Sequence, residues 1–182
     1  MKEFPATVDA AIVGGGVFGL SIAAFLARAG RRVAVLERAA IGSGSSGRSG
    51  AIVRSFYRQP LLARGVETCR REIWENFEDL FECPGQEETA FRKVGLVLYG
   101  PDGEREGLAA HFAACGVRME VVAPRDLGGA FPYLREPGAG EVLWHEPEAG
   151  FARAYVVLGS LARFVRSHGG HVFEDCPVHS AK

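Results

Sequence analysis

The hydrophobic positions near the start of the chain follow two different spacings, which predict strands and helices in alternation. A short apolar run rich in β-branched residues over 8–13 is typical of a strand that is buried on both faces, and 32–36 is expected to form a second strand. Between them, small and apolar residues recur at helical spacing over 17–29, and Gly30 is suited to end that helix in a left-handed conformation. This order predicts a strand–helix–strand unit with parallel strands.

The rest of the chain continues this alternation. An amphipathic helix is expected over 60–81, with one apolar stripe formed by Leu62, Val66, Cys69, Ile73, Phe77 and Leu80. Further strands are expected over 91–99, over 117–122, over 142–144 and from 171. Helical segments are expected over 108–115, 124–127 and 155–165.

Composition and charge exclude several classes of protein. With 47% hydrophobic and 24% charged residues, the chain has the composition of a soluble globular protein. A formal net charge of -1 argues against broad electrostatic binding to nucleic acid or to an anionic membrane. The four cysteines form no C-x-x-C pair, which indicates reduced thiols of an intracellular protein and no metal site: Cys69, Cys83, Cys115 and Cys176.

The stretch 10–27 lies near the N-terminus and carries no charge, as a signal peptide or a membrane span would. Glu3 and Asp9 are acidic where a signal peptide is basic, and the consecutive glycines at 14–16 interrupt the apolar run. We therefore expect a cytoplasmic protein without a membrane span.

Three glycines mark the turn between the first strand and the first helix. Gly14, Gly16 and Gly19 form the pattern G-x-G-x-x-G. The first glycine permits the tight turn, the second allows backbone to approach a pyrophosphate, and the third lets the helix pack close to the strand. Because the residues after Gly16, Val17 and Phe18, begin the helix, a pyrophosphate would lie at its N-terminus.

An acidic residue completes this pattern. Glu37 ends the second strand, roughly 20 residues beyond the glycines, where a carboxylate can accept hydrogen bonds from ribose hydroxyls. A plain turn requires neither this spacing nor the acid, so a dinucleotide site is the favoured interpretation. NADP is disfavoured because the carboxylate of Glu37 would repel its 2′-phosphate, although the adjacent positive charge of Arg38 leaves that point open. An NAD-dependent dehydrogenase with the same glycine pattern remains an alternative.

A loop rich in Gly and Ser follows the second strand. Residues 42–49 fit the pattern G-x-x-x-x-G-R-S, a Walker A motif with Arg48 in place of lysine. We discount a P-loop because 50–53 is expected to be extended and not helical. The favoured interpretation is a loop whose N–H groups, hydroxyls and Arg48 surround a polyanionic cofactor; a flexible solvent loop is the alternative.

The glycine pattern followed by SGRSGAIVRSFY at 46–57 resembles the FAD-dependent amine and D-amino-acid oxidoreductase (DAO) family. Within it, the likeness is to the branch of the sarcosine oxidase β-subunit and dimethylglycine dehydrogenase. The resemblance implies an α/β fold: a Rossmann-like FAD-binding domain with a parallel sheet and helices, plus the beginning of an α+β substrate-binding region. The segments would be 1–85 for FAD binding, 86–150 for substrate binding and 151–182 for the return to the FAD-binding domain.

The resemblance also implies roles for particular residues. Arg54 would hold a substrate carboxylate, while a surface arginine at a strand end is the alternative. No residue is a good catalytic base, and the five histidines are expected in surface or capping roles. The residues expected to contact FAD are Gly14, Gly16, Val17, Phe18, Gly19, Glu37, Arg38, Ser45, Ser46, Gly47 and Arg48.

The function that the resemblance implies is oxidation of the C–N bond of a secondary amine or amino acid to an imine. Substrates similar to sarcosine, glycine or a D-amino acid are expected. Proteins of this family run to about twice the present length, which fits a chain of two ordinary domains. The chain would then correspond to the N-terminal portion, and a complementary chain could supply the rest. The alternative is a catalytically inactive dinucleotide-binding fragment or a subunit of a multi-chain oxidase.

Overall fold

The computed structural model describes residues 4–83 and 89–180. Within these ranges the chain forms two compact units. The first contains the described residues up to 51, together with 77–83, 89–90 and 152–180, and the second contains 52–76 and 91–151.

The elements of the first unit begin with a parallel sheet and the helix that connects its first two strands. They are β1 (Ala10–Val13), α1 (Val17–Arg28), β2 (Val33–Leu36), α3 (Phe77–Leu80), α6 (Ala154–Ser167) and β9 (His171–Phe173). The strand order is β1-β2-β9, and all pairs are parallel, with Ala10 opposite Val33 and Ala34 opposite His171.

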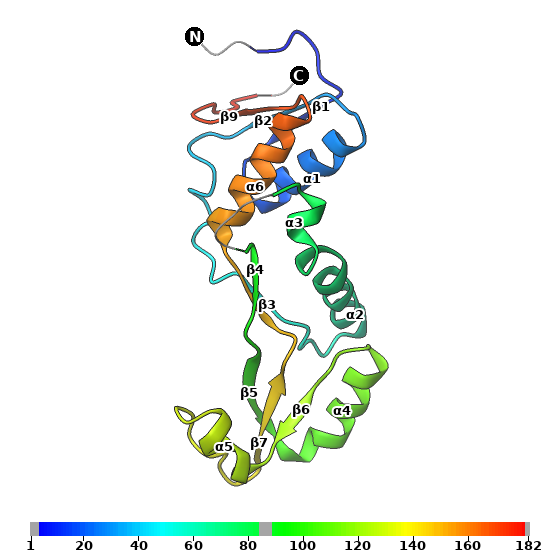
Figure 1. Cartoon of the computed structure of the whole chain (residues 1–182), viewed down its shortest axis with the longest axis vertical. Coiled ribbons are helices and arrows are strands. Elements are labelled where there is room, and N and C mark those ends of the chain that lie inside the picture. The colour runs from blue at the N-terminus through cyan, green and yellow to red at the C-terminus, as the bar shows by residue number, and fades with distance from the viewer. Residues whose placement is uncertain (1–3, 84–88, 181–182) are drawn as a thin grey trace. The chain divides into compact units, whose positions relative to one another are not determined.

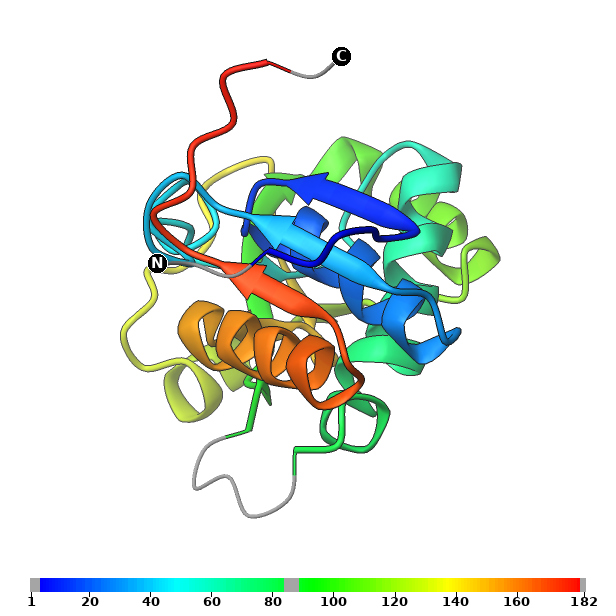
Figure 2. The same ribbon diagram turned by 90° about the horizontal axis from the view of Figure 1, so that it is seen from above.

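Helices α1 and α6 lie side by side against one face of this sheet (Figures 1 and 2). The buried face of α1 consists of small residues and one leucine, which allow close approach to α6 and β2: Leu20, Ala23, Ala24 and Ala27. Helix α6 contributes larger apolar side chains to the same core, among them Val157, Leu158, Leu161, Phe164 and Val165.

The first strand differs from the prediction in its burial. β2 is buried over Val33–Val35, but β1 alternates between half-buried and exposed residues, and Val13 is 68% exposed. The expectation that this strand is buried on both faces was therefore wrong. The reason is its position, because β1 is the edge strand of the described sheet and pairs only with β2 within it.

The second unit contains two sheets and several short helices. Its elements are β3 (Ile52–Val53), α2 (Pro60–Cys69), a π-helical turn (Arg70–Trp74), β4 (Phe91–Lys93), β5 (Leu96–Pro101), a 3₁₀ turn (Asp102–Glu104), α4 (Arg105–Ala114), β6 (Glu120–Val122), α5 (Pro124–Ala130), β7 (Glu141–Glu146) and most of β8 (Gly150–Ala152). The strands form the orders β5-β7-β6, which is antiparallel, and β3-β8-β4.

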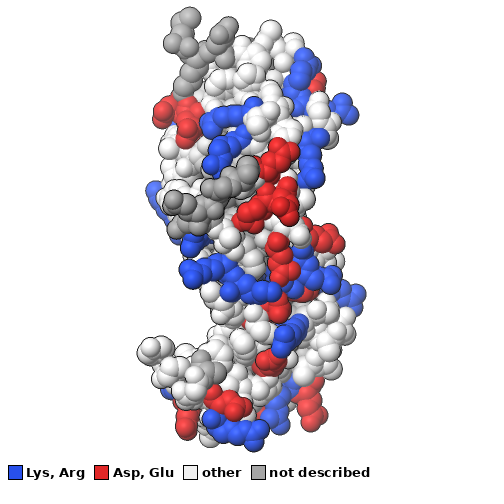
Figure 3. All heavy atoms as spheres, viewed as in Figure 1, with Lys and Arg blue, Asp and Glu red and all other residues white. Residues whose placement is uncertain are grey.

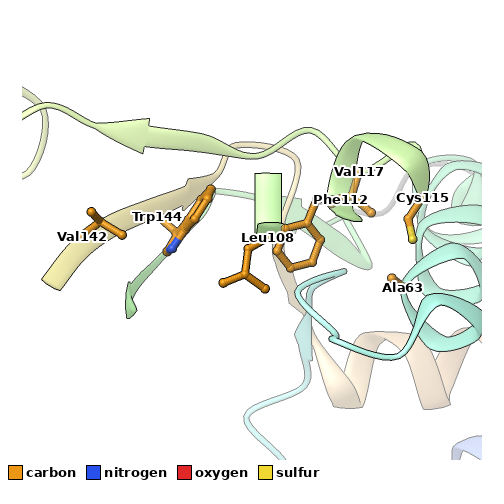
Figure 4. Close-up of a cluster of buried hydrophobic side chains, with 7 residues drawn as sticks. All are labelled: Ala63, Leu108, Phe112, Cys115, Val117, Val142 and Trp144. Atoms are coloured by element: carbon orange, nitrogen blue, oxygen red, sulfur yellow. The ribbon is translucent and has the colours of Figure 1, made fainter. Parts of the chain in front are cut away.

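A hydrophobic cluster joins α4 to the sheet β5-β7-β6 (Figure 4). Trp144 of β7 and Phe112 of α4 lie edge to face at its centre, with ring centroids 6.4 Å apart. The other buried members are Ala63, Leu108, Cys115, Val117 and Val142. This packing explains why the short segments of the second unit form regular structure at all, since isolated helices of this length are marginal in water.

The segment predicted as one helix over 60–81 is three pieces: α2, the π-helical turn and α3. The buried face of the first two pieces is also different from the predicted stripe. Leu62 and Cys69 are exposed, whereas Ala63, Glu67 and Arg70 are buried. Apolar periodicity gave the wrong face because Glu67 and Arg70 neutralise each other in an ion pair, and charged residues are counted as surface residues in such patterns.

The strand predicted over 91–99 is interrupted at Val94 and Gly95, between β4 and β5. Both N–H groups donate to the carbonyl of Ala149, at 3.2 and 2.8 Å. Gly95 has φ +76°, and a Cβ there would lie 2.7 Å from Nε2 of His145. A residue with a side chain would be strained at this positive φ, so glycine favours the bend that separates β4 from β5.

The compact units do not follow the segment boundaries expected from the sequence. Residues 52–76, which the sequence placed in the first segment (1–85), belong to the second unit. The assignment of cofactor and substrate binding to the segments 1–85, 86–150 and 151–182 stays a prediction.

Candidate dinucleotide-binding site

The turn between β1 and α1 is built as the glycine pattern requires. Gly14 has φ +107°, and its N–H donates to the carbonyl of Leu36 at 2.9 Å. A Cβ at Gly19 would lie 2.0 Å from the carbonyl oxygen of Gly14, a distance that no side chain can occupy. Glycine at 19 is thus what allows α1 to start directly against the turn.

The N-terminus of α1 meets a second loop. Gly16 caps the helix without a side chain, and the N–H of Val17 donates to Oγ of Ser46 at 3.0 Å. A Cβ at Gly16 would lie 3.0 Å from the same oxygen. The absence of a side chain at Gly16 therefore lets the loop of Ser46 approach the positive end of the helix dipole.

That second loop repeats the geometry of the first. Gly42, Gly44 and Gly47 have the same G-x-G-x-x-G spacing as the first three glycines. Gly42 has φ +79°, and a Cβ at Gly47 would lie 2.0 Å from the Gly42 carbonyl oxygen. Turns follow it, and the chain then extends into β3, as the argument against a P-loop expected. The Walker-like interpretation overlooked this repeat, although the spacing is visible in the sequence.

Glu37 is held at the end of β2 by backbone donors. Its Oε2 accepts the N–H of Gly15 at 2.6 Å, and its Oε1 accepts the N–H of Ala39 at 3.0 Å. These two hydrogen bonds hold the pKa of this carboxyl below its usual value, and the bond from the N–H of Ala39 has the larger effect. The side chain is therefore an ionised acceptor at neutral pH, fixed beside the glycine turn.

A pocket of about 440 Å³ brings most of the predicted cofactor residues together. The guanidinium groups of Arg38 and Arg48 form no hydrogen bond or ion pair with another residue in the described ranges, so both positive charges are available to an anionic ligand. The pocket is lined by Gly16, Glu37, Arg38, Ala39, Gly42, Ser43, Gly44, Ser45, Ser46 and Arg48.

A second pocket of about 350 Å³ shares Glu37 and Arg38 with the first. It is also lined by Val13, Gly14, Leu36 and the segment Pro177, Val178 and His179. Sequence reasoning missed this segment. It reaches the site because the N–H groups of Asp175 and Cys176 donate to the carbonyls of Ala39 and Glu37, at 3.0 and 2.8 Å. No local pattern could have revealed bonds across so many residues.

Some predicted residues do not line either pocket. Phe18 is 84% exposed, and the glycines at 19 and 47 act through the backbone contacts described above. Val17 contributes its N–H to Ser46. Their assignment as cofactor contacts stays a prediction.

Arg54 lies in the second unit, directly after β3. It is partly buried, and its guanidinium carbon lies 5.5 Å from the ring centroid of Tyr57. Within the described chain the guanidinium has no carboxylate partner. An arginine on an aromatic face, with its donors unpaired, is suited to capture of a carboxylate.

The part of the chain that the structure describes contains neither a cluster of metal ligands nor a membrane-spanning helix. There, no three His, Cys, Asp or Glu side chains gather as metal ligands would. The helices of the same residues are all too short or too polar to cross a bilayer. Acidic and basic side chains are intermixed on the face shown in Figure 3.

The family of the chain follows from its similarity to known proteins. Residues 9–182 match the model of the DAO family, described as FAD dependent oxidoreductase. The chain belongs to this family. The resemblance inferred from the glycine pattern and residues 46–57 is thereby confirmed.

Individual relatives agree with this assignment. The sarcosine oxidase subunit beta of Rhizobium meliloti (strain 1021) is 32% identical over 180 residues, which cover 93% of this chain and 42% of the relative. The glycine oxidase from Geobacillus kaustophilus superposes with a TM-score of 0.75 at 26% identity, over 92% of this chain and 46% of that protein.

A second solved structure, L-proline dehydrogenase from P. horikoshii, gives a TM-score of 0.79 at 22% identity, over 94% of this chain and 45% of that protein. The predicted α/β fold with a Rossmann-like parallel sheet is therefore confirmed. The chain spans less than half the length of each of these three proteins.

Proposed function

We propose that this chain binds FAD through its first unit and contributes to oxidation of the C–N bond of a secondary amine or amino acid to an imine. The observation that carries the proposal is the ionised Glu37, held by the Gly15 N–H between two pockets beside the glycine turn. Family membership and the relatives named as sarcosine and glycine oxidases support the class of substrate.

The residues of the first unit fit the anionic centre of FAD. The larger pocket lies beside the N-terminus of α1, where the helix dipole favours negative charge. Arg38 and Arg48 add two positive charges, and the hydroxyls of Ser43, Ser45 and Ser46 add hydrogen-bond donors. Bound FAD would supply the two-electron oxidation of the substrate, while the chain's share is to bind and orient.

The adenosine half would lie at Glu37. Each carboxylate oxygen can accept more than one hydrogen bond, so the bonds from Gly15 and Ala39 leave acceptors for the ribose hydroxyls. The second pocket then offers Val13, Leu36 and Val178 to the apolar face of an adenine ring. In this proposal Pro177–His179 join the cofactor residues expected from the sequence.

Arg54 would bind the substrate carboxylate. Its unpaired guanidinium can form two parallel hydrogen bonds with a carboxylate, and the ring of Tyr57 limits the directions that it can take. Its role is to orient the substrate and not to move a proton.

A second candidate is a catalytically inactive dinucleotide-binding piece, or a subunit that works with a complementary chain. The observation that favours it is the name of one relative, the sarcosine oxidase subunit beta, which is itself a subunit and is 32% identical to this chain. The two candidates share the cofactor site and differ in turnover.

The test is retention of flavin by the purified chain after incubation with FAD and desalting, read from the visible absorption spectrum. We expect flavin bands, and an affinity about tenfold lower in Glu37→Gln, since a hydrogen bond to a charged group is lost. Glu106→Gln, an exposed carboxylate on α4, is the matched control and should bind FAD as the wild type does.

A colourless protein would contradict FAD binding by this chain. Flavin retention without oxidation of sarcosine, glycine or D-amino acids would favour the inactive candidate.

A further inference from the structure

A buried polar cluster in the second unit has no part in the chemistry proposed so far. Ser55, Glu67, Arg70 and Glu146 are each at most 5% exposed, although three of them carry ionisable groups. Burial of such groups costs free energy unless they are paired or hydrogen-bonded. Their contacts converge on one residue, Ser55, which follows Arg54 directly.

The first contact comes from the end of β7. Oε1 of Glu146 accepts the backbone N–H of Ser55 at 2.5 Å, across 91 residues of sequence. Its other oxygen, Oε2, is buried and has no hydrogen-bond partner in the described chain. Burial raises the pKa of this carboxyl above its usual value, which favours the neutral form. The negative charge of Glu67 acts on the pKa of Glu146 in the same direction.

The second contact comes from α2. The hydroxyl of Ser55 donates to Oε2 of Glu67 at 3.1 Å. Glu67 is itself fixed by Arg70, whose Nε and Nη2 donate to its two oxygens at 3.0 and 2.6 Å. This bidentate pair holds the carboxylate in a single orientation toward Ser55.

The π-helical turn extends this support. The N–H of Glu75 donates to the carbonyl of Arg70 at 3.0 Å, the i to i+5 bond of a π-helix. The wider turn brings the carboxylate of Glu75 to Nη1 of Arg70, at 2.7 Å. Lys93 bonds to both Glu75 and Glu148, at 3.0 and 2.6 Å, and closes the cluster on its outer side.

We propose that Glu146 and Glu67 are positioning residues for Arg54: they hold Ser55 from two sides and so fix the backbone that carries the substrate-binding guanidinium. The inference rests on the proposed role of Arg54. The carbonyl of Ser55 accepts the N–H of Tyr57 at 2.8 Å, so the same clamp also places the ring over which the guanidinium lies.

Stability alone does not account for this cluster. A buried ion pair contributes little net stability compared with apolar residues of the same volume. Ser55 also receives one contact on its backbone N–H and another on its hydroxyl, from elements far apart in the chain. Two directional contacts on the neighbour of an unpaired arginine are suited to positioning.

The test measures acetate binding to the full chain by NMR, at constant ionic strength, through the amide shifts of residues 54–57. Acetate should bind the wild type, and Arg54→Gln should abolish the shifts. Glu146→Leu should weaken binding about tenfold, because it removes the acceptor for Ser55. Glu146→Gln should restore it, since an amide oxygen still accepts that N–H. Glu141→Gln, an exposed position on the same strand β7, is the control and should bind normally.

The outcomes separate the two proposals. Absent wild-type binding, or normal binding by Arg54→Gln, would overturn the role of Arg54 and the positioning inference with it. Loss in Arg54→Gln with normal binding by Glu146→Leu would overturn only the positioning inference. Hydrogen exchange of the wild-type Ser55 amide gives a check that needs no variant. Slow exchange supports the clamp, and exchange at the rate of an exposed amide overturns it.

Discussion

The two units hold their candidate site residues by different means. In the first unit most of these contacts come from the backbone: glycine conformations, N–H groups and carbonyls define the turn and hold Glu37. In the second unit, the buried side chains of Glu146 on β7 and Glu67 on α2 hold the segment of Arg54. The glycine turn of the first unit has no room for a Cβ atom at Gly19, so it is sensitive to any larger residue there. The contacts around Ser55 in the second unit instead depend on keeping both side chains of each hydrogen-bonded or ion pair.

The largest effect should come from breaking the buried pair of the second unit. Arg70→Met leaves the carboxylate of Glu67 buried without its partner, which should lower the free energy of unfolding by about 3–5 kcal/mol. Chemical denaturation of the full chain measures it. The double variant Glu67→Leu/Arg70→Met should recover most of this loss, and a double variant as unstable as the single one would contradict the explanation.

Next in size is a backbone clash in the first unit. Gly19→Ala would place a Cβ 2.0 Å from the Gly14 carbonyl oxygen. The expected loss in the free energy of unfolding is about 3 kcal/mol, with loss of flavin retention. Gly107→Ala is the matched control, because Gly107 is also helical and a Cβ there meets no atom within 4 Å. It should be neutral or stabilise by about 0.5–1 kcal/mol, and equal destabilisation by both variants would refute the argument.

The pH dependence of the first unit should reflect Glu37. Its pKa is lower in the folded chain, so its stabilising contribution is present above its usual pKa and is lost as pH falls through the folded value. Glu37→Gln should cost on the order of 1–2 kcal/mol at neutral pH, with the difference from wild type vanishing in acid. Thermal melts of both proteins across that range test this; a pH-independent difference would argue against an ionised Glu37.

The smallest effect should come from Glu146, and its sign is opposite. Its pKa is raised in the folded chain, so wild-type stability is fully present below the usual pKa and declines as pH rises through the folded value. Glu146→Gln stays neutral and should lack this decline. Melting temperatures of the two proteins should therefore diverge as pH rises, and parallel profiles would show that Glu146 titrates normally.

Prediction from sequence succeeded where contacts are local. The βαβ unit and its glycine turn lie within one short stretch, and their structure follows from spacing and from the conformations that glycine allows. The cofactor role of Glu37 stays a prediction. Prediction failed on the burial of β1 and on the face of α2. In both, the deciding partner lies outside the segment, because a strand's burial depends on its place in the sheet and a buried charge on its counterion.

The sequence by itself therefore determined the fold class, the glycine turn and the family of this protein, since each depends on residues near one another in the chain. Only the tertiary structure decided that Pro177–His179 line a pocket with Glu37, and that Ser55 lies between Glu146 and Glu67. The physical reason is the same for both. Hydrogen bonds between distant segments do not change the spacing of hydrophobic residues along the sequence. A glutamate also contributes the same polar position to that spacing whether its side chain is in water or accepts a hydrogen bond from a buried amide.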